Sequence, residues 1–354
     1  MESLIFGPDG TVTGIQPGLN GQAGMGGDAL AGRMLTGGCL LDEPPVPPCT
    51  WGAGDEILWS AGESLIIAGP DGTGKTTLAG ELVRSRLGLA SSVLGMDVKP
   101  GSRRVLYLAM DRPRQARRAL ARLFTEADRA VLDERLVLWP GPPPQDLAAC
   151  PDMLTAMCGA AGADTVVVDS LKDAALRLSD DETGSGWNRA RQTCIAAGTE
   201  MVELHHPRKA SGDNKKPSKL EDLYGSRWIP AGAGSVIMLW GEAGDAVVDF
   251  GHLKHPHTEV GPWRMAIDNI AGTVSICHSV NLVEQIRLRA GHGCTVAVAA
   301  ELLSGGGKPT RAGLDKARRR LTRLTESGIL VCRPGEHGGA PGRDVATWFL
   351  TGRE

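Results

Sequence analysis

The chain has 354 residues, with 38 Lys and Arg against 41 Asp and Glu, and a formal net charge of −3. This length is enough for one large domain and a second, smaller one. The eight cysteines form no CxxC pair, and no apolar run approaches the roughly 18 residues of a membrane span. These features exclude the disulfide-rich secreted and membrane classes, and we expect a soluble, cytoplasmic protein with reduced thiols.

Residues 1–50 begin with two β-rich runs around a Pro-Asp-Gly turn and continue in Gly-rich and then Pro-rich sequence. The two runs predict a hairpin. The composition of the remainder is typical of a linker or arm. We therefore predict an N-terminal arm over 1–50, followed by larger units at 51–279 and 280–354.

Residues 51–279 alternate short, strongly apolar runs with longer stretches that are typical of helices. The predicted strands are 64–69, 104–110, 135–141, 164–170, 199–206 and 234–240, and the predicted helices are 75–88, 112–127, 152–162 and 188–198. Buried strands that alternate with helices are typical of a parallel sheet covered on both faces. We predict an α/β fold with a mainly parallel sheet, and antiparallel hairpins within 246–278 at one edge.

The stretch GPDGTGKT at 69–76 follows one predicted strand and precedes a predicted helix. It matches the pattern G-x-x-x-x-G-K-[ST], in which loop N–H groups and the helix N-terminus face a phosphate. We expect Lys75 to contact the β- and γ-phosphates of ATP, Thr76 to bind Mg²⁺, and the unusual acid Asp71 to point outward. The predicted ATP-binding residues of this stretch are Gly69, Pro70, Asp71, Gly72, Thr73, Gly74, Lys75, Thr76 and Thr77.

Two further predicted strands end in a carboxylate. The strand DTVVVDS places Asp169 at the C-terminal edge of the sheet, where it is expected to hold Mg²⁺. The strand in VLYLAMDRP ends near Asp111, which we take as the candidate general base for hydrolysis. The alternative for each aspartate is a structural role as a helix N-cap.

The motifs GPDGTGKTT, YLAMDRP, VVVDSLKDA, LHHPRK and YGSRWIPAGAGSVIML resemble the RecA-like P-loop ATPases. Within that group they resemble the RepA-type hexameric helicases of plasmids and other mobile elements. The resemblance covers residues 55–260, with the motifs in the expected order. It implies a homo-oligomeric ATPase, expected to be a hexamer, that uses ATP and Mg²⁺ and acts on single-stranded DNA in replication.

The histidines of LHHPRK take their expected role from this resemblance. His205 or His206 would contact the γ-phosphate and report its presence, and we take His206 as the catalytic one of the pair. A zinc site that joins them to the histidines of HLKHPHT is the alternative, but the spacing matches no standard ligand set. The histidines of that segment are His252, His255 and His257.

The polar loop after these histidines is rich in lysine. In the resembling proteins such loops line a central channel and grip nucleic acid. An ordinary solvated loop is the alternative. The lysines concerned are Lys209, Lys215, Lys216 and Lys219.

The sequence departs from the resembling group at two positions. The catalytic carboxylate is usually Glu, whereas Asp111 is one methylene shorter. Gly234 stands where an arginine is expected to reach a neighbouring subunit's nucleotide. Arg227 is the nearest substitute for that arginine, and Arg208 or Lys254 are further candidates.

The C-terminal segment, from residue 280, carries 12 Lys and Arg against 7 Asp and Glu, so it is basic by five charges. Helices near 281–290, 295–303 and 310–327, followed by two strands, predict a winged helix-turn-helix. In the third helix Leu314, Ala317, Leu321 and Leu324 form an apolar stripe. A basic face formed by Lys316, Arg319, Arg320 and Arg323, with Arg333 and Arg343 in the wing, is expected to contact DNA backbone or to serve as an interaction module.

Three functions remain open from the sequence. The first is a DNA-stimulated, oligomeric ATPase, most concretely a helicase. The second is a RecA-like recombination or loading ATPase that does not unwind DNA. The third is a nucleotide-dependent regulatory switch that binds DNA and hydrolyses little ATP.

Overall fold

The computed structural model describes residues 3–6 and 12–16, as backbone only, together with 34–208, 216–277, 282–289, 293–303, 309, 311–335 and 346–351. The chain forms two compact units, Met1–Pro48 and Cys49–Glu354. In the first unit β1 (Ser3–Phe6) and β2 (Val12–Gln16) pair antiparallel, as predicted, and a 3-10 helix follows at Gly37–Leu41. The predicted Pro-Asp-Gly turn lies outside the described residues.

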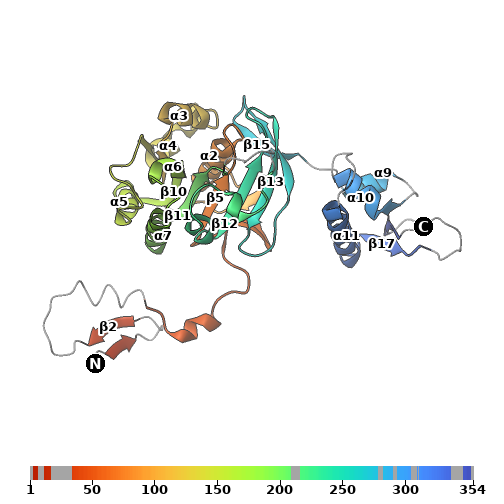
Figure 1. The fold of residues 1–354 in the computed structure, drawn as a ribbon, viewed down its shortest axis with the longest axis horizontal. Helices are drawn as coiled ribbons and strands as arrows, with labels where there is room; N and C mark the ends of the chain where they lie inside the picture. Colours follow the sequence, from red (N-terminus) through yellow and green to blue (C-terminus); the bar gives the residue numbers. More distant parts are fainter. Residues whose placement is uncertain are drawn as a thin grey trace. The chain divides into compact units, whose positions relative to one another are not determined.

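A nine-stranded sheet organises the described part of the second unit (Figure 1). Its strand order is β15-β14-β13-β12-β5-β11-β10-β8-β9, and the six strands from β12 to β9 are mutually parallel. The α/β prediction is confirmed, as are the antiparallel hairpins at one edge. The strands are β5 (Ser64–Ala68), β8 (Arg104–Ala109), β9 (Leu136–Pro140), β10 (Ala163–Asp169), β11 (Glu200–His205), β12 (Ser235–Trp240), β13 (Val247–Lys254), β14 (Trp263–Asp268) and β15 (Thr273–Cys277).

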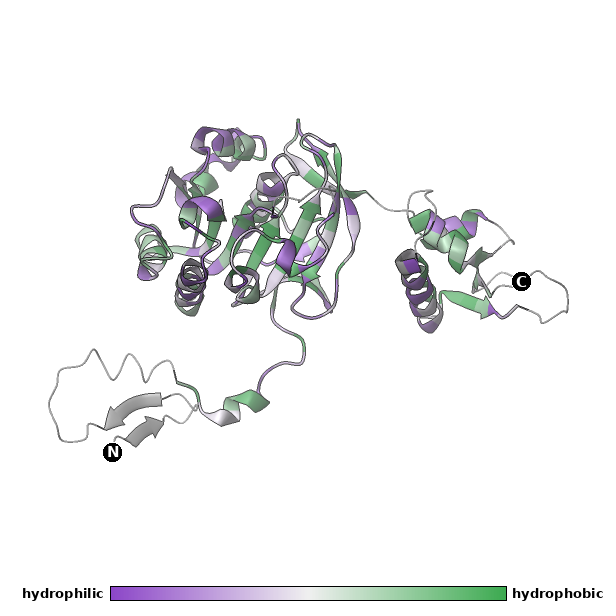
Figure 2. Ribbon diagram, viewed as in Figure 1, coloured by the Kyte–Doolittle hydropathy of each residue, from purple (hydrophilic) through white to green (hydrophobic). Residues whose placement is uncertain are grey.

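Helices cover both faces of this sheet, because alternate residues of each buried strand point to opposite sides. In β5, Ile67 belongs to the core beneath α2 and α3, whereas Ile66 belongs to the core beneath α5 and α7. Figure 2 shows the central strands as predominantly hydrophobic and the outer sides of the helices as hydrophilic. The helices are α2 (Lys75–Arg86), α3 (Pro113–Ala121), α4 (Arg129–Arg135), α5 (Asp152–Ala161), α6 (Leu171–Ala174), α7 (Asp181–Ala196) and α8 (Trp228–Ala231).

Two helix predictions differ from the structure. The predicted helix 112–127 ends at Ala121, because Thr125 and Asp128 form a capping box that starts a separate turn before α4. The predicted helix 188–198 begins seven residues earlier, at Asp181. Its first turns contain Gly184 and Gly186, which pack directly against Ser226 and Ala148, so the glycines mark close contacts and do not end the helix.

A small second sheet was not predicted. It has the order β4-β3-β7-β6 and combines strands from before and after the phosphate-loop helix. Trp51 and Trp59 are fully buried in it, and the indole of Trp51 donates to the carbonyl of Val93 at 3.1 Å. The strands are β3 (Cys49–Ala53), β4 (Glu56–Ser60), β6 (Ser92–Val93) and β7 (Met96–Val98).

The C-terminal elements lie where the sequence predicts them and have a hydrophobic core of their own. Ala317 and Leu321 of the predicted stripe are fully buried in this core. A short strand, β16, joins the two predicted strands in a sheet of order β16-β18-β17. The elements are α9 (Leu282–Leu288), β16 (Cys294–Thr295), α10 (Val296–Leu303), α11 (Arg311–Glu326), β17 (Leu330–Arg333) and β18 (Thr347–Leu350).

The basic face predicted for this segment is described in part. Arg319, Arg320 and Arg323 of α11 are exposed, and Arg333 lies over the ring of Phe349 at 4.9 Å. The side chain of Lys316 and all of Arg343 lie outside the described residues. A separate winged-helix domain from residue 280 remains a proposal.

Within the described ranges, no helix combines the length and the apolar character that crossing a membrane requires.

Candidate functional site

Four adjacent parallel strands end at the same edge of the sheet, in the order β5, β11, β10 and β8. Their register places Ala68 beside His205, and Asp169 beside Ala109. The segments that follow these strands therefore meet at one place. The carboxyl edge of a parallel sheet is where such folds bind ligands.

The phosphate loop after β5 has the backbone shape that its glycines predict. Gly72 and Gly74 adopt positive φ angles of 75° and 86°, which cost glycine little. A Cβ at Gly74 would also lie only 2.7 Å from the side chain of Ile267. Thr73 is fully buried, and its hydroxyl donates to the carbonyl of Pro70 at 2.8 Å.

Lys75, the first residue of α2, folds back over this loop. Its ammonium donates to the carbonyls of Gly69 and Pro70, both at 2.7 Å. Burial lowers the pKa of Lys75 to about 8, although the carboxylates of Asp71 and Asp169 act in the opposite direction. The amine is thus held at the loop by two neutral acceptors, which an anionic phosphate would exceed in hydrogen-bond strength.

Asp169 is the centre of a hydrogen-bonded group at the end of β10. Its Oδ2 accepts from the hydroxyl of Tyr107 at 2.7 Å and from that of Thr76 at 3.3 Å. Burial raises the pKa of this carboxyl, while the two hydroxyl donors and Lys75 oppose the rise. The N-cap alternative is not supported, since the N-cap of the following helix is Ser170.

The pair Thr76 and Asp169 fits a magnesium ion. Mg²⁺ prefers oxygen ligands and usually binds one or two protein groups together with waters and substrate phosphates. The two side chains offer one hydroxyl and one carboxylate oxygen, 3.3 Å apart, beside the phosphate loop. Within the described part of the chain no cluster of three or more His, Cys, Asp or Glu could hold a metal ion, so phosphates would have to complete the coordination.

Asp111 follows β8 and is about one-third exposed. Its Oδ2 lies 3.4 Å from the ammonium of Lys172 and 3.5 Å from Nε of Arg112. The N-cap of α3 is Arg112, without a side-chain capping bond, so Asp111 does not cap that helix. Its carboxylate is available at the sheet edge, between two cations.

One cavity contains most of the predicted catalytic and nucleotide-binding side chains. Lys75, Thr76, Asp111, Asp169 and His206 all line it. Four further lining residues were not predicted, and they come from the start of α3 and from the β14–β15 turn. They are Arg112, Gln115, Ala116 and Asn269.

The two adjacent histidines have different surroundings. His206 lines the cavity, and its Nδ1 lies 3.7 Å from a carboxylate oxygen of Asp71. His205 is fully buried, and its Nε2 lies 2.6 Å from the carbonyl of Tyr224. Burial lowers the pKa of His205 to about 4, so this ring is neutral and Nε2 is the donor. The structure therefore brings His206 to the cavity and does not bring His205 there.

Asp71 is largely exposed, as predicted, with 73% of its side chain accessible. It nevertheless borders the cavity through its approach to His206. The histidines of HLKHPHT are engaged elsewhere, since His252 on β13 is buried with Nε2 2.9 Å from the hydroxyl of Ser235. The structure does not gather the histidine set of the zinc alternative.

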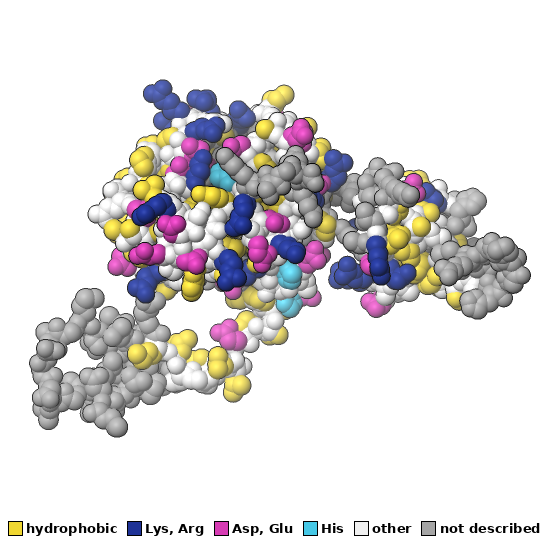
Figure 3. All heavy atoms as spheres, in the orientation of Figure 1, with side chains coloured by type: hydrophobic (Ala, Val, Ile, Leu, Met, Phe, Trp, Pro, Cys, Tyr) yellow, Lys and Arg dark blue, Asp and Glu magenta, His cyan; other side chains and the backbone are white. Residues whose placement is uncertain are grey.

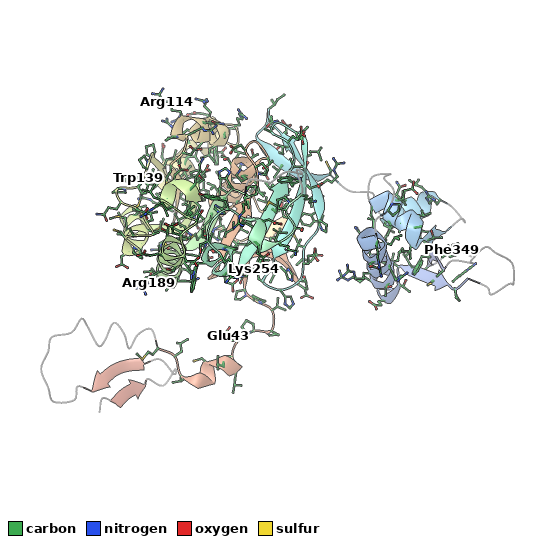
Figure 4. The ribbon with its side chains drawn as sticks, in the orientation of Figure 1. Glu43, Arg114, Trp139, Arg189, Lys254 and Phe349 are labelled. Atoms are coloured by element: carbon green, nitrogen blue, oxygen red, sulfur yellow. The ribbon has the colours of Figure 1, made fainter. Side chains whose placement is uncertain are left out.

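The three cations considered for a role at a neighbouring subunit lie away from this cavity. Arg208 and Arg227 line a different pocket together, beside Pro230. The ammonium of Lys254 donates to the carbonyl of Ala231 at 2.7 Å, and Figure 4 labels its position on β13. No larger residue fits at position 234, because a Cβ on Gly234 would overlap Glu63.

Of the lysines in the polar loop, two are described. Lys216 forms an ion pair with Asp249 at 2.7 Å, and Lys219 is exposed. Lys209 and Lys215 lie outside the described residues.

A buried ion pair behind the cavity was not predicted. Arg191 of α7 and Glu203 of β11 are both fully buried and form two hydrogen bonds, of 2.7 and 2.8 Å. The indole of Trp187 donates to the same carboxylate at 2.8 Å. This group ties α7 to the strand that carries His206. A charged residue inside the apolar run TEMVELHH was the available signal.

Comparison with known proteins supports an ATPase domain. The model of a family described as an AAA domain matches residues 41–212. Among curated proteins there is no match. Many solved structures do match, including one described as the ATPase domain of another protein, at 13% identity and a TM-score of 0.45, over 60% of this chain and 84% of that chain. At this TM-score the likeness carries no argument about function.

Proposed function

We propose that this chain is a DNA-stimulated ATPase that works as an oligomer, most concretely a helicase of the replicative type. The observation that carries the proposal is the gathering of Lys75, Thr76, Asp111, Asp169 and His206 around one cavity. These residues follow four separate strands, and no structural need of the fold requires those particular groups at one edge. The AAA-domain match over 41–212 supports the ATP-binding part of the proposal.

Each residue has a distinct part in the proposed reaction. Lys75 exchanges the carbonyls of Gly69 and Pro70 for the β- and γ-phosphate oxygens of ATP. Thr76 and Asp169 would hold Mg²⁺, which neutralises charge that develops on the phosphates. Asp111 accepts the proton of the attacking water. His206 donates a hydrogen bond to the γ-phosphate and loses it after hydrolysis.

The proposed oligomer supplies what a single copy lacks at its cavity. Arg208 and Arg227 share a pocket that is separate from the nucleotide cavity. In an oligomer one of them would reach the neighbouring subunit's γ-phosphate as an arginine finger. Lys219 and the other lysines of the polar loop would then face a common channel and contact single-stranded DNA.

The first test is the rate of ATP hydrolysis with and without single-stranded DNA. We expect the wild type to be stimulated and Lys75→Ala to lose hydrolysis under both conditions, because the variant removes the cation that meets the phosphates. A mass measurement with ATP present should give a species several times heavier than one chain. Strand displacement on a forked duplex then separates a helicase from a recombination or loading ATPase.

Two outcomes would contradict this proposal. A protein that stays monomeric and whose hydrolysis ignores DNA is not an oligomeric motor. A protein that binds ATP tightly but hydrolyses it no faster with DNA would instead be a nucleotide switch.

The pKa of Lys75 predicts how ATP affinity depends on pH. The pKa is about 8 in the free protein, and bound phosphate should raise it, because the charged form gains anionic partners. Binding then takes up a proton between the two pKa values, so affinity is highest below about pH 8 and falls by up to tenfold per unit above it. Fluorescence titration with a labelled ATP analogue between pH 7 and pH 10 measures this.

Lys75→Arg is the matched control for the pH experiment. A guanidinium stays charged throughout this range, so the variant should bind more weakly but with a flatter pH profile. A wild-type profile as flat as that of the variant would show that Lys75 does not titrate on binding.

A further inference from the structure

The segment that starts α3 contains five arginines within eleven residues: Arg112, Arg114, Arg117, Arg118 and Arg122. The helix is strongly two-sided. Ala116 and Leu120 are buried against α2, whereas Arg114, Arg117 and Arg118 are exposed. With 3.6 residues per turn, positions 114, 117 and 118 share one face, opposite to the buried one.

This face is free of acidic partners among the described residues. Arg112 pairs with Asp111, but the structure gives no ion pair to Arg114, Arg117 or Arg118. Figure 3 shows their kind of side chain, in dark blue, gathered where Figure 1 places α3, and Figure 4 shows Arg114 pointing away from the helix. Four arginines of this segment line a surface groove together with Pro113, Gln115 and Pro140.

We propose that this arginine face of α3, defined by Arg114, Arg117 and Arg118, is a second binding surface for the phosphate backbone of nucleic acid, separate from the lysine loop. The inference rests on the proposed function for the presence of nucleic acid. Guanidinium groups bind phosphate oxygens in a bidentate manner. Arg114 and Arg118 are separated by four residues, or about 6 Å along the helix axis, so they can follow successive phosphates.

The composition of the face favours nucleic acid over an acidic protein. Protein interfaces usually bind through apolar or aromatic anchors in a dry centre. Around the exposed arginines the sequence offers alanine and proline and no aromatic residue from 112 to 122. The same lack of aromatic side chains removes base stacking, so the contact should be insensitive to base sequence.

The position of the face connects it to the nucleotide. Arg112 and Gln115 line both the groove and the nucleotide cavity. Arg112 is also one of the two cations beside Asp111. A phosphate in the groove would compete with Asp111 for this guanidinium. Nucleic acid bound on α3 is thus placed to change the surroundings of the candidate base.

The test is the binding of a fluorescent oligothymidylate, measured by anisotropy between about 50 and 200 mM salt. Full-length wild type is compared with the triple variant R114A/R117A/R118A. Each phosphate contact to a single strand contributes about 0.7 to the slope of log K against log salt. We expect the triple variant to lose about two units of slope and at least about tenfold in affinity at low salt.

The control removes the same charge elsewhere on the unit, in R103A/R189A/R264A, since Arg103, Arg189 and Arg264 are exposed and lie outside α3. We expect its affinity and slope to stay close to those of wild type. Binding of a labelled ATP analogue without DNA checks that both triple variants are folded, because neither changes a residue that lines the nucleotide cavity.

Three outcomes overturn the inference, and they differ in what else they affect. If the α3 variant binds the oligonucleotide as wild type does, the α3 surface is wrong and the proposed function stands. If wild type itself does not bind the oligonucleotide, the proposed function fails as well. If polyglutamate binds wild type as tightly as the oligonucleotide and the α3 variant loses that binding, the surface belongs to an acidic protein.

Discussion

Replacement of Asp111 by Asn is expected to lower the rate of ATP hydrolysis by about 10²- to 10⁴-fold, the usual contribution of a general base. The change removes the proton acceptor but keeps the side chain's size. Asp111 lies at the cavity and faces Lys172 and Arg112, and it does not hold the phosphate loop. We therefore expect ATP affinity to change only by about twofold to threefold, within the range of a surface substitution. Single-turnover hydrolysis and equilibrium binding of ATP measure the two effects.

Asp111→Glu is the control for this prediction. It restores the carboxylate and adds the methylene by which Asp111 is shorter than the usual catalytic glutamate. Hydrolysis should be retained, at a rate equal to or above that of wild type. If Asp111→Asn hydrolyses ATP as fast as wild type, another group is the base, and Asp111 serves only to pair with Lys172.

Replacement of Arg191 by Ala is expected to lower the free energy of unfolding by about 3–5 kcal/mol, because Glu203 is left buried without its ionic partner. Both side chains are fully buried, and Trp187 is the remaining donor to the carboxylate. Urea-induced unfolding, followed by tryptophan fluorescence, measures the loss. Glu203 lies on β11, so we also expect weaker ATP binding at temperatures where the variant begins to unfold.

Arg189→Ala provides the matched control on the same helix. Arg189 is exposed and lies two residues before Arg191 (Figure 4), and its replacement should change the free energy of unfolding by less than about 0.5 kcal/mol. The double variant Arg191→Met with Glu203→Leu should recover much of the stability, since an apolar pair leaves no charge unpaired. Equal stability of Arg191→Ala and wild type would show that the buried pair does not hold α7 to the sheet.

The strands of the central sheet could be predicted because each is a short apolar run with a clear boundary. Helix ends were predicted less well. The end of α3 depends on the capping box of Thr125 and Asp128, and the start of α7 depends on glycines that touch Ser226 and Ala148. The small sheet of β3, β4, β6 and β7 could not be predicted, since its strands are short and pair across the intervening β5 and α2.

The phosphate loop, Asp111 and Asp169 could be named from the sequence because each follows an apolar strand directly. The sequence could not choose between His205 and His206. Adjacent residues of an extended strand point to opposite sides, and which side faces the cavity depends on the twist and neighbours of β11. Tyr107, Lys172 and Gln115 were missed because only tertiary packing brings them to the sheet edge.

By itself, the sequence determined the α/β alternation, the glycine-rich phosphate loop and the strand-end aspartates, since these follow from local periodicity and backbone preference. Only the tertiary structure decided which side chains share one cavity, that His205 is buried against Tyr224, and that the arginines of α3 form a single exposed face. Those outcomes depend on contacts between segments distant along the chain, where packing and burial, and not local preference, set the position of each charged group.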